Sequence, residues 1–567
     1  MPPTVSDTAP QATPSAASPT VLTRPVRYPS DGGALLEHLT RAGLLRTTRN
    51  PADDNAAVRP VDCVLLESAD ITTKASRTTV AILEASARLT CWGGTVTAEA
   101  LDAVDGQGPG ADGLAALARL EESLAEHITD RSPGRLTLTL PTSADDDPTL
   151  EERERLTALS TIEPLRVLAQ AEVDHLHLPL EAGAFAFDYL STFESLPEVA
   201  QGANTCPDYL FYDARIILVV DHPTREATLV GASVDTADLE RRMDALAAAI
   251  DSIDNAADVE APASSTDGAA SPVLHAVPTV SDADFEAVVE EMRGYIADGD
   301  VYQVVPSRGF TIACPDALAA YHVLRHANPS PYMFYLAAPD FELFGASPES
   351  ALLHSARTGR VAIRPIAGTR PRGLHPDGSV DHERDTRLEL ELRTDAKEVA
   401  EHVMLVDLAR NDVARVSRPG TRSVQDLLRV DRYSRVMHLV SEVSGELADD
   451  LDALDAFRAS MTMGTLTGAP KLRAAELIRQ AEGVRRGSYG GSVGYIRGDG
   501  ELDTCIVIRS GFVTNGSALV QAGAGIVAAS SPAAEAAETV HKARAVLEAV
   551  AAAQGATLVI DTTGKEA

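Results

Sequence analysis

Apolar residues recur along this chain at two different spacings, which predict a mixture of helices and strands. Helical spacing is clearest after Ser281 and Asp284, an S-x-x-D pair typical of a helix start. The apolar residues that follow are three or four positions apart: Phe285, Val288, Val289, Met292, Tyr295 and Ile296. Such a stripe lies on one face of a helix, so the second half of the chain is expected to open with a helix.

Shorter apolar or alternating runs predict strands in both halves of the chain. In the first half they are residues 61–66, 135–140, 184–190 and 215–220, with a helix at 235–250. In the second half the expected strands are 301–305, 332–336, 360–366, 489–496, 504–509 and 518–526, and the expected helices are 394–409, 471–480 and 533–552. Each half is therefore predicted to mix α and β structure.

Two stretches show neither pattern. Residues 1–20 are rich in Pro, Ser, Thr and Ala and are predicted to be a disordered tail, because they cannot bury enough apolar surface to offset chain entropy. Residues 255–271 have a similar composition and are predicted to be a linker or long surface loop. Two folded regions are expected, 21–254 and 281–553, within the range that 567 residues allow.

The charge balance excludes some classes of partner. The chain has 49 Lys and Arg residues against 83 Asp and Glu residues, a net charge of −34, which argues against binding to nucleic acid or to anionic membranes. The five cysteines are far apart and never form a C-x-x-C pair, so neither a disulfide framework nor a zinc site is expected. Without a basic, apolar leader or a run of about 18 apolar residues, a cytoplasmic protein is expected.

Two carboxylate pairs of the form E-x-x-E carry the most chemical information. They are Glu398 with Glu401, and Glu535 with Glu538, each within a predicted helix. Residues three apart share one helical face, so four carboxylates would meet if the two helices converge. Oxygen ligands of this kind suit Mg²⁺. The alternative is that both pairs lie on solvated helix faces of an acidic protein.

Glycine-rich stretches form a second group of candidates: residues 464–471 (GTLTGAPK), 487–494 (GSYGGSVG) and 523–525 (GAG). Glycine lets backbone N–H groups approach an anion closely, and Thr465, Arg509, Lys471 and Lys542 could add a hydroxyl group and positive charge. An anionic small molecule is the implied ligand. GTLTGAPK lacks the spacing of a phosphate loop, and these glycines could instead serve turns and strand crossings.

Single acid and base groups are also present. Glu349 in GASPES could donate a proton if a dry pocket raises its pKa, and His438 in SRVMHLVSEV could shuttle one. Thr369 in IRPIAGTRPRG lies in a further polar motif. On these residues alone, His438 could equally be a structural residue of a strand.

Ten strings occur in order and together carry a specific resemblance: GDVYQVVPSR, NPSPYMFYL, GASPES, RPIAGTRPRG, KEVAEHVMLVDLARNDVARV, YSRVMHLVSEV, GTLTGAPK, YGGSVGY, DTCIVIRS and QAGAGIVAASSP. They resemble the chorismate-utilising enzymes, and among them anthranilate synthase component I, over about residues 281–550. In the first half the resemblance is thinner and rests mainly on VLLES around Ser68. It implies an α+β fold of large, mostly antiparallel sheets sandwiched by helices, with 21–254 as a mixed α/β regulatory domain and 281–553 as the catalytic domain.

The resemblance implies an enzyme that adds ammonia to C2 of chorismate, expels the C4 hydroxyl group and eliminates pyruvate to give anthranilate, the first step of tryptophan biosynthesis. Mg²⁺ would be held by Glu401 and Glu538, with Glu398 and Glu535 as neighbouring carboxylates. Substrate-binding positions by resemblance are Gly368, Thr369, Tyr489, Arg509, Gly523, Ala524 and Gly525, and Lys542 is added as a nearby cation.

Four residues form the catalytic set that the resemblance implies: Glu349, His438, Thr465 and Gln303. Glu349 matches the acid that helps the C4 hydroxyl group to leave, and His438 matches a residue of the pyruvate elimination step. Isochorismate-forming and salicylate-forming relatives carry a lysine where this chain has Gln303, to deprotonate water. Aminodeoxychorismate synthases commonly carry a nucleophilic lysine at the position of Ala367. Both absences favour anthranilate as the product.

Partners and control also follow from the resemblance. A glutamine amidotransferase subunit would supply ammonia, in an assembly of two large and two small subunits. Tryptophan would act as a feedback inhibitor, and Ser68, Pro331, Tyr332 and Met333 match residues that bind it. Two other functions stay open at this point: aminodeoxychorismate synthase component I, and a catalytically silent tryptophan-binding regulatory subunit.

Overall fold

The structure is a computed structural model that describes residues 18–49, 58–70, 73, 75–104, 106, 108–142, 151–253, 272–375, 379–433 and 436–561. The expected linker at 255–271 and residues 1–17 of the expected tail lie outside the described residues. The first strand already begins at Thr20.

The first half of the chain contains strands and helices in alternation. Its strands are β1 (Thr20–Val26), β2 (Thr47–Thr48), β3 (Arg59–Pro60), β4 (Cys63–Ala69), β5 (Ser76–Trp92), β6 (Thr95–Ala100), β7 (Ile128–Ser132), β8 (Arg135–Thr139), β9 (Leu180–Phe185), β10 (Tyr209–Asp221) and β11 (Glu226–Ser233). Its α-helices are α1 (Gly32–Arg41), α2 (Ala111–Leu124), α3 (Glu152–Thr157), α4 (Glu163–Ala169) and α5 (Thr236–Asp251).

The second half has the same mixture. Its strands are β12 (Val273–Pro278), β13 (Gln303–Val304), β14 (Ser307–Ala313), β15 (Tyr332–Ala337), β16 (Glu342–Ser347), β17 (Ser350–Ser355), β18 (Arg360–Ile363), β19 (Ile366–Pro371), β20 (Ser423–Arg432), β21 (Val436–Glu446), β22 (Gly468–Ala469), β23 (Ser492–Arg497), β24 (Leu502–Ile506), β25 (Ser510–Thr514), β26 (Ser517–Gly523) and β27 (Thr557–Ile560). Its α-helices are α6 (Asp282–Asp298), α7 (Ala317–Ala327), α8 (His382–Thr394), α9 (Ala396–Val416), α10 (Ala453–Ser460), α11 (Gly464–Thr467), α12 (Lys471–Glu482) and α13 (Pro532–Ala553).

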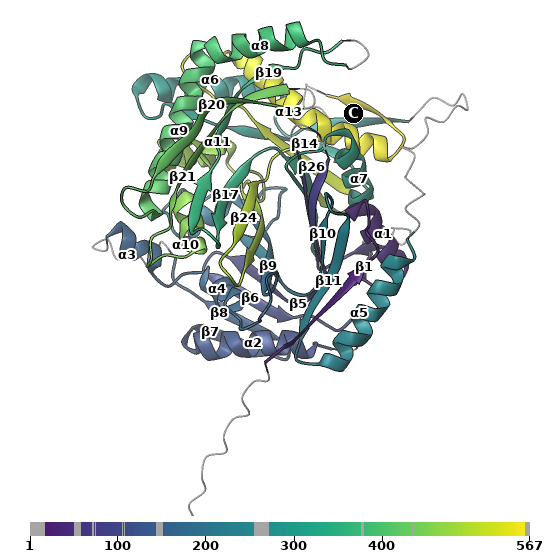
Figure 1. Ribbon diagram of the computed structural model, residues 1–567. Helices are drawn as coiled ribbons and strands as arrows, with labels where there is room; N and C mark the ends of the chain where they lie inside the picture. Colours follow the sequence, from purple (N-terminus) through teal and green to yellow (C-terminus); the bar gives the residue numbers. More distant parts are fainter. Residues whose placement is uncertain are drawn as a thin grey trace, which may run out of the picture.

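Most of the strands form one large, mostly antiparallel sheet system with helices around its outside, and β2 with β3 and β13 with β22 form two small separate sheets (Figure 1). Strands of the two halves pair with each other, because β4 is antiparallel to β15 and β9 is antiparallel to β23. The pair β12 and β27 is parallel. This arrangement confirms the expected α+β fold, and it joins 21–254 and 281–553 through shared sheets. The boundaries of the two regions stay a prediction.

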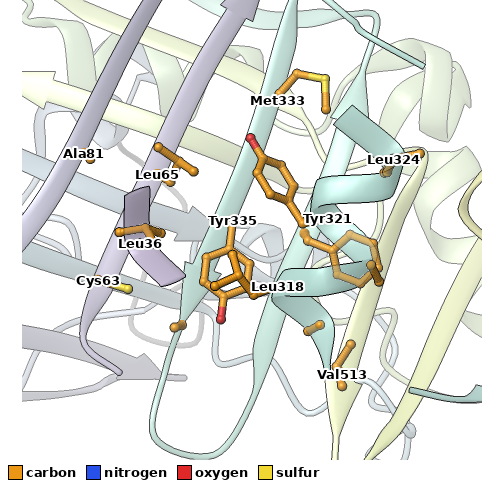
Figure 2. Packing of buried hydrophobic residues seen from close by; sticks show 14 of the residues in the cluster. Leu36, Cys63, Leu65, Ala81, Leu318, Tyr321, Leu324, Met333, Tyr335 and Val513 are labelled. Carbon is orange, nitrogen blue, oxygen red and sulfur yellow. The ribbon is translucent and has the colours of Figure 1, made fainter. Parts of the chain in front are cut away.

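The largest buried cluster also draws on both halves. Figure 2 shows Leu36 of α1 and Leu65 of β4 close to Tyr321 of α7 and Tyr335 of β15. All four side chains are at most 1% exposed, so this joint is as dry as a domain interior. Burying such apolar area is the main stabilising contribution to the contact between α1, α7 and the sheet.

Most predicted elements are present, with shifted ends. The Ser281 hydroxyl group accepts a hydrogen bond from the backbone N–H of Asp284 and caps α6, as the sequence predicts. The prediction of a strand over 184–190 was wrong in part, because β9 ends at Phe185 and a 3₁₀ helix spans Phe187–Thr192. The predicted strand at 360–366 is divided into β18 and β19. Among the described residues, no helix is both long and apolar enough to span a bilayer.

Candidate active site

Two long helices present the predicted glutamate pairs near their N-termini. Helix α9 begins after Asp395, whose carboxylate accepts hydrogen bonds from the backbone N–H groups of Lys397 and Glu398. This cap fixes the first turn, from which Glu398 and Glu401 follow on one face. Helix α13 begins at Pro532, a residue suited to the first helical position, and carries Glu535 and Glu538 in its first two turns.

The two pairs face the same space. The pKa of Glu401 is raised to about 7, mainly by burial and in addition by the charges of Glu398 and Glu538. Burial alone would raise the pKa of Glu538, but the nearby Lys542 outweighs this effect and the pKa is lowered. Lys542 Nζ lies 2.7 Å from Glu538 Oε1. Because the charge of Glu538 on α13 raises the pKa of Glu401 on α9, the two helices border one acidic site.

The other two glutamates are held by neighbours. Arg370 donates a hydrogen bond of 2.8 Å to Glu398 Oε1 and also forms an ion pair with Asp395. Burial raises the pKa of Glu535, although a hydrogen bond with Ser530 partly offsets the effect. Arg370 was not among the predicted site residues. Its place in the GTRPRG motif, one residue after Thr369, was the available signal.

The GAG stretch, which begins with the last residue of β26, packs closely beside the acidic site and needs glycine there. A Cβ atom at Gly525 would lie 2.6 Å from Gln303 Nε2 and 3.4 Å from Glu401 Oε1. At Gly523 it would lie 2.8 Å from the Pro306 carbonyl oxygen and 3.0 Å from the hydroxyl oxygen of Tyr489. Between them Ala524 is fully buried, and its N–H donates to the Pro306 carbonyl group.

Further polar groups reach the same chain segments. Lys542 Nζ donates a hydrogen bond of 2.9 Å to the Gly523 carbonyl oxygen. Gln303 Nε2 donates to Glu401 Oε1 over 3.3 Å, and Gln303 itself is 2% exposed. The Gln303 Oε1 atom is buried and has no hydrogen-bond partner among the described residues. An unpaired buried acceptor at this point is available to an N–H or O–H donor of a ligand.

His438 of β21 lies beside the predicted substrate residues Gly368 and Thr369 of β19. Its Nδ1 atom is 3.0 Å from Thr369 Oγ1 and 3.3 Å from the carbonyl oxygen of Gly368. Because a carbonyl group only accepts, Nδ1 carries the proton in this arrangement and Nε2 keeps its lone pair. Burial and the charge of Arg509 lower the pKa of His438 to about 4. The imidazole is therefore neutral at pH 7.

The pKa of Glu349 is raised, whereas that of His438 is lowered. Glu349 lies between β16 and β17, is 6% exposed, and burial raises the pKa of its carboxyl group to about 8. The neighbouring Thr465 side chain, the Ile366 backbone and the charge of Arg509 offset only part of that increase. Glu349 is therefore mostly protonated at pH 7 and able to donate a proton, as predicted for an acid in a dry pocket.

Arg509 and Tyr489 complete the set. Arg509 is buried in a left-handed conformation with a φ of 51° between β24 and β25, and its charge acts on Glu349 and Glu538. Burial raises the pKa of Tyr489 to about 12, so its hydroxyl group stays protonated. Lys471 was expected to add charge to this site, and that expectation was wrong. Its ammonium group is paired with Asp412 at 2.8 Å and with the Ser460 carbonyl group.

A separate cavity of about 540 Å³ lies where the two halves meet. It is lined by Ser68 and Arg77 of the first half, and by Pro331, Tyr332 and Asp503 of the second. The Tyr332 hydroxyl group lies 3.1 Å from Asp503 Oδ1, and burial raises the pKa of Asp503 to about 6. Three further arginines line this cavity: Arg364, Arg429 and Arg432. Acidic and basic groups thus face one space that is large enough for an amino acid.

Met333 differs from the other residues of its motif. It is 3% exposed and its sulfur atom accepts a hydrogen bond from the Ser330 N–H over 3.3 Å. It pairs with Glu67 where β15 runs beside β4, so it supports the wall of the cavity from the core side.

Comparison with known proteins shows the family to which the chain belongs. The family described as chorismate binding enzyme matches residues 129–548. Anthranilate synthase component 1 of Vibrio parahaemolyticus is 48% identical over 499 residues, 87% of this chain and 88% of that protein. The Escherichia coli protein of the same name is 47% identical over 501 residues, 87% of this chain and 92% of its own length.

A solved structure has a similar fold. The crystal structure of anthranilate synthase component I from Streptococcus pneumoniae matches with a TM-score of 0.61 and 29% identity, covering 83% of this chain and 92% of that one. Fold and site therefore define a chorismate-utilising enzyme, and the chain belongs to the chorismate binding enzymes. Within that family, the relatives named above assign it to the anthranilate synthase component 1 branch, as the sequence motifs predict.

Proposed function

We propose that this chain converts chorismate and ammonia into anthranilate and pyruvate in the site between α9 and α13, with Mg²⁺ as cofactor. The observation that carries the proposal is the meeting of two glutamate pairs at Gly525, Gln303 and Lys542. The same site contains a protonated carboxyl group and a neutral imidazole, which the chemistry also requires.

The donor set suits Mg²⁺. Glu401 and Glu538 offer carboxylate oxygens from facing helices. The pKa of Glu401 is raised to about 7, mainly by burial and also by the neighbouring carboxylates, and a bound cation would offset both effects. Gly525 leaves space beside Glu401 that a side chain would fill. Glu401 and Glu538 would hold the ion, and Glu398 and Glu535 would orient them and nearby water. When bound, Mg²⁺ supplies positive charge for the ring carboxylate of chorismate.

The first step is amination. The ammonia lone pair forms a bond to C2, the ring double bonds shift, and the C4–O bond breaks. Glu349 gives its proton to the departing oxygen, which leaves as water. Gln303 Oε1, the unpaired buried acceptor, can hold an N–H of the attacking ammonia, and no base is needed because ammonia already carries a free lone pair.

The second step is elimination. His438 accepts the proton that leaves C2 as the ring becomes aromatic, through the Nε2 lone pair that its Nδ1 hydrogen bonds leave available. The bond between C3 and the ether oxygen breaks, and its electron pair leaves with the side chain as the enolate of pyruvate. Uptake of one proton at the methylene carbon of this enolate gives pyruvate. Gly368, Thr369, Tyr489, Arg509 and the 523–525 segment hold the substrate, with Lys542 nearby.

Ammonia comes from a separate glutamine amidotransferase subunit, the second component that the relatives' name "component 1" implies. All five cysteines of this chain are buried and none is disulfide-bonded. Burial raises the pKa of thiols such as Cys206, so they do not suit the nucleophile of a glutaminase. The proposed assembly has two large and two small subunits and works in the cytoplasm.

Tryptophan acts as a feedback inhibitor in the cavity of Ser68, Pro331 and Tyr332, with Met333 behind its wall. The cavity has carboxylates for an ammonium group and guanidinium groups for a carboxylate, which matches a zwitterion. The walls of the cavity come from both halves, so a ligand there can bias the relative position of the halves. A coupling free energy of about 1–3 kcal/mol between the two sites is typical of such control.

The test is product identification. The purified chain is incubated with chorismate and ammonium salts, with and without Mg²⁺ and with and without tryptophan, and the product is analysed by fluorescence and mass. Formation of anthranilate that requires Mg²⁺ and is inhibited by tryptophan is expected. Aminodeoxychorismate as the product would identify the sister activity, against which Ala367 argues because it offers no nucleophile. Tryptophan binding without chorismate turnover would identify a silent regulatory subunit.

A further inference from the structure

Helix α7 presents two histidines one turn apart, facing the start of α1. His322 Nδ1 lies 3.6 Å from Asp31 Oδ1, and His326 Nε2 lies 3.6 Å from Asp31 Oδ2. One ligand atom from each of the three residues lies within 4.8 Å of the others. Around a tetrahedral Zn²⁺ with bonds of about 2.0–2.1 Å, ligand atoms are separated by about 3.3 Å. The cluster needs only small side-chain shifts to reach that spacing.

The orientation of His326 is already that of a metal ligand. Its Nδ1 atom lies 2.8 Å from the His322 carbonyl oxygen, which can only accept, so Nδ1 carries the proton. Nε2 therefore directs its lone pair at Asp31. In known metal sites the ligating histidine usually donates its other N–H to a carbonyl or carboxylate group in this way. His322 lies on the same face of α7 as His326, because residues four positions apart share one face of a helix.

Space and charge at the cluster also fit a cation. Gly33 lies two residues after Asp31, and a Cβ atom there would lie 3.3 Å from Asp31 Oδ1, so a larger residue would crowd this oxygen. Arg325 donates to Asp31 over 2.9 Å, but it also pairs with the buried Glu67 at 2.9 Å. Its single positive charge is thus shared by two carboxylates. With neutral imidazoles, Asp31, Glu67 and Arg325 together carry one net negative charge.

We propose that Asp31, His322 and His326 form a binding site for a divalent transition metal, with Zn²⁺ as the expected ion and water as the fourth ligand on the exposed side of His326. Two imidazoles and one carboxylate form a ligand set that favours Zn²⁺ over Mg²⁺. The site uses α1 and α7, and none of the helices that carry the four active-site glutamates. Bound metal links the start of α1 in the first half to α7 in the second, two helices that also contribute to the buried cluster of Figure 2.

Metal titration tests the proposal. The metal-free chain is titrated with Zn²⁺ against a chromophoric chelator in excess Mg²⁺, which occupies oxygen-rich sites, and Co²⁺ absorption reports the geometry. One Zn²⁺ per chain with a Kd in the micromolar range or tighter is expected. His326→Gln and His322→Gln should each weaken binding at least about tenfold. His382→Gln, an exposed histidine on α8, is the matched control and should change nothing.

Stability gives a second readout. Zn²⁺ at 100 times its Kd should stabilise the folded chain by about 2.7 kcal/mol and raise Tm, because the metal binds the folded state. This increase should disappear in His326→Gln, while turnover with ammonium in the absence of Zn²⁺ stays at the wild-type level. The proposal would be overturned if the wild type and the variant carrying both His322→Gln and His326→Gln bound Zn²⁺ with equal affinity. It would also be overturned if the wild type bound no Zn²⁺ at concentrations up to about 100 µM.

Discussion

Individual residues of the site hold unusual protonation states, and burial is the main cause at two of them. Glu349 retains its proton at pH 7 because burial raises its pKa to about 8, and His438 stays neutral because burial and Arg509 lower its pKa to about 4. One group is thus poised to give a proton and the other to accept one. The sequence showed both residue types, but their environments come from chain segments far apart.

Replacing the acid tests its role. Glu349→Gln keeps the shape of the side chain and removes the proton donor, so kcat with ammonium should fall about 10²–10⁴-fold. Binding of chorismate should change little. The control is Glu342→Gln on β16, a buried carboxyl group that bonds to Tyr335 away from the site. Near-normal kcat in Glu349→Gln would contradict the assignment.

The pH profile gives an independent check. Glu349 must be protonated to act, so activity should be present below its folded-state pKa of about 8 and lost as pH rises through that value. The quantity to measure is kcat/KM for chorismate at saturating Mg²⁺ and constant free ammonia. It should fall about tenfold per pH unit above the Glu349 pKa of about 8. His438, with a pKa of about 4, should add no limb above pH 5. A profile level up to pH 9 would disagree with this picture.

At the scale of elements, the site depends on the way β13, the segment after β26 and α9 crowd together. Gly525→Ala would place a methyl group 2.6 Å from Gln303 Nε2, so the Gln303 side chain, which donates to Glu401, must move. A displacement of this size should lower kcat/KM on the order of 10²-fold and weaken Mg²⁺ binding. The two are measured by steady-state kinetics and by titration.

A matched glycine serves as the control. Gly294 lies within α6, and a Cβ atom there meets nothing within 4 Å. Gly294→Ala should leave activity unchanged and raise the free energy of unfolding by about 0.5–1 kcal/mol, since alanine favours helix. If Gly525→Ala were as active as Gly294→Ala, the close packing at Gly525 would not matter for function.

Helix-scale features were the easiest to predict from sequence. The S-x-x-D start of α6 and the E-x-x-E pairs of α9 and α13 depend on residues three or four apart, which local periodicity reveals. Long-range contacts were not accessible in this way. Lys471 looked available beside a glycine-rich stretch, yet it pairs with Asp412, 59 positions away. Arg370, which holds Glu398, was missed for the same reason.

At the scale of the whole molecule, the two halves are joined by common sheets and a common core. Strand β4 leads from the buried joint with β15 to Ser68 at the mouth of the 540 Å³ cavity. A ligand in that cavity touches both halves, while the glutamate site lies between helices of the second half. The molecule therefore has a physical route by which an inhibitor can act on catalysis from a distance.

Ser68→Leu tests this route. The larger apolar side chain fills the cavity and removes a hydroxyl group, so the tryptophan concentration for half inhibition should rise about tenfold or more, equivalent to about 1.4 kcal/mol. Turnover without tryptophan should stay near the wild-type value. Ser132→Leu, at the exposed end of β7, is the control. The same inhibition curve in Ser68→Leu and the wild type would place the inhibitor elsewhere.

The central claim is that carboxylates of α9 and α13 share one divalent ion. Its most direct test is calorimetric titration of Mg²⁺, in the presence of chorismate, into the wild type and into Glu401→Gln and Glu538→Gln. The wild type should bind one Mg²⁺ per chain. Both variants should stay folded but lose this binding, and they should also lose the activity with ammonium. Binding and turnover at the wild-type level in both variants would contradict it.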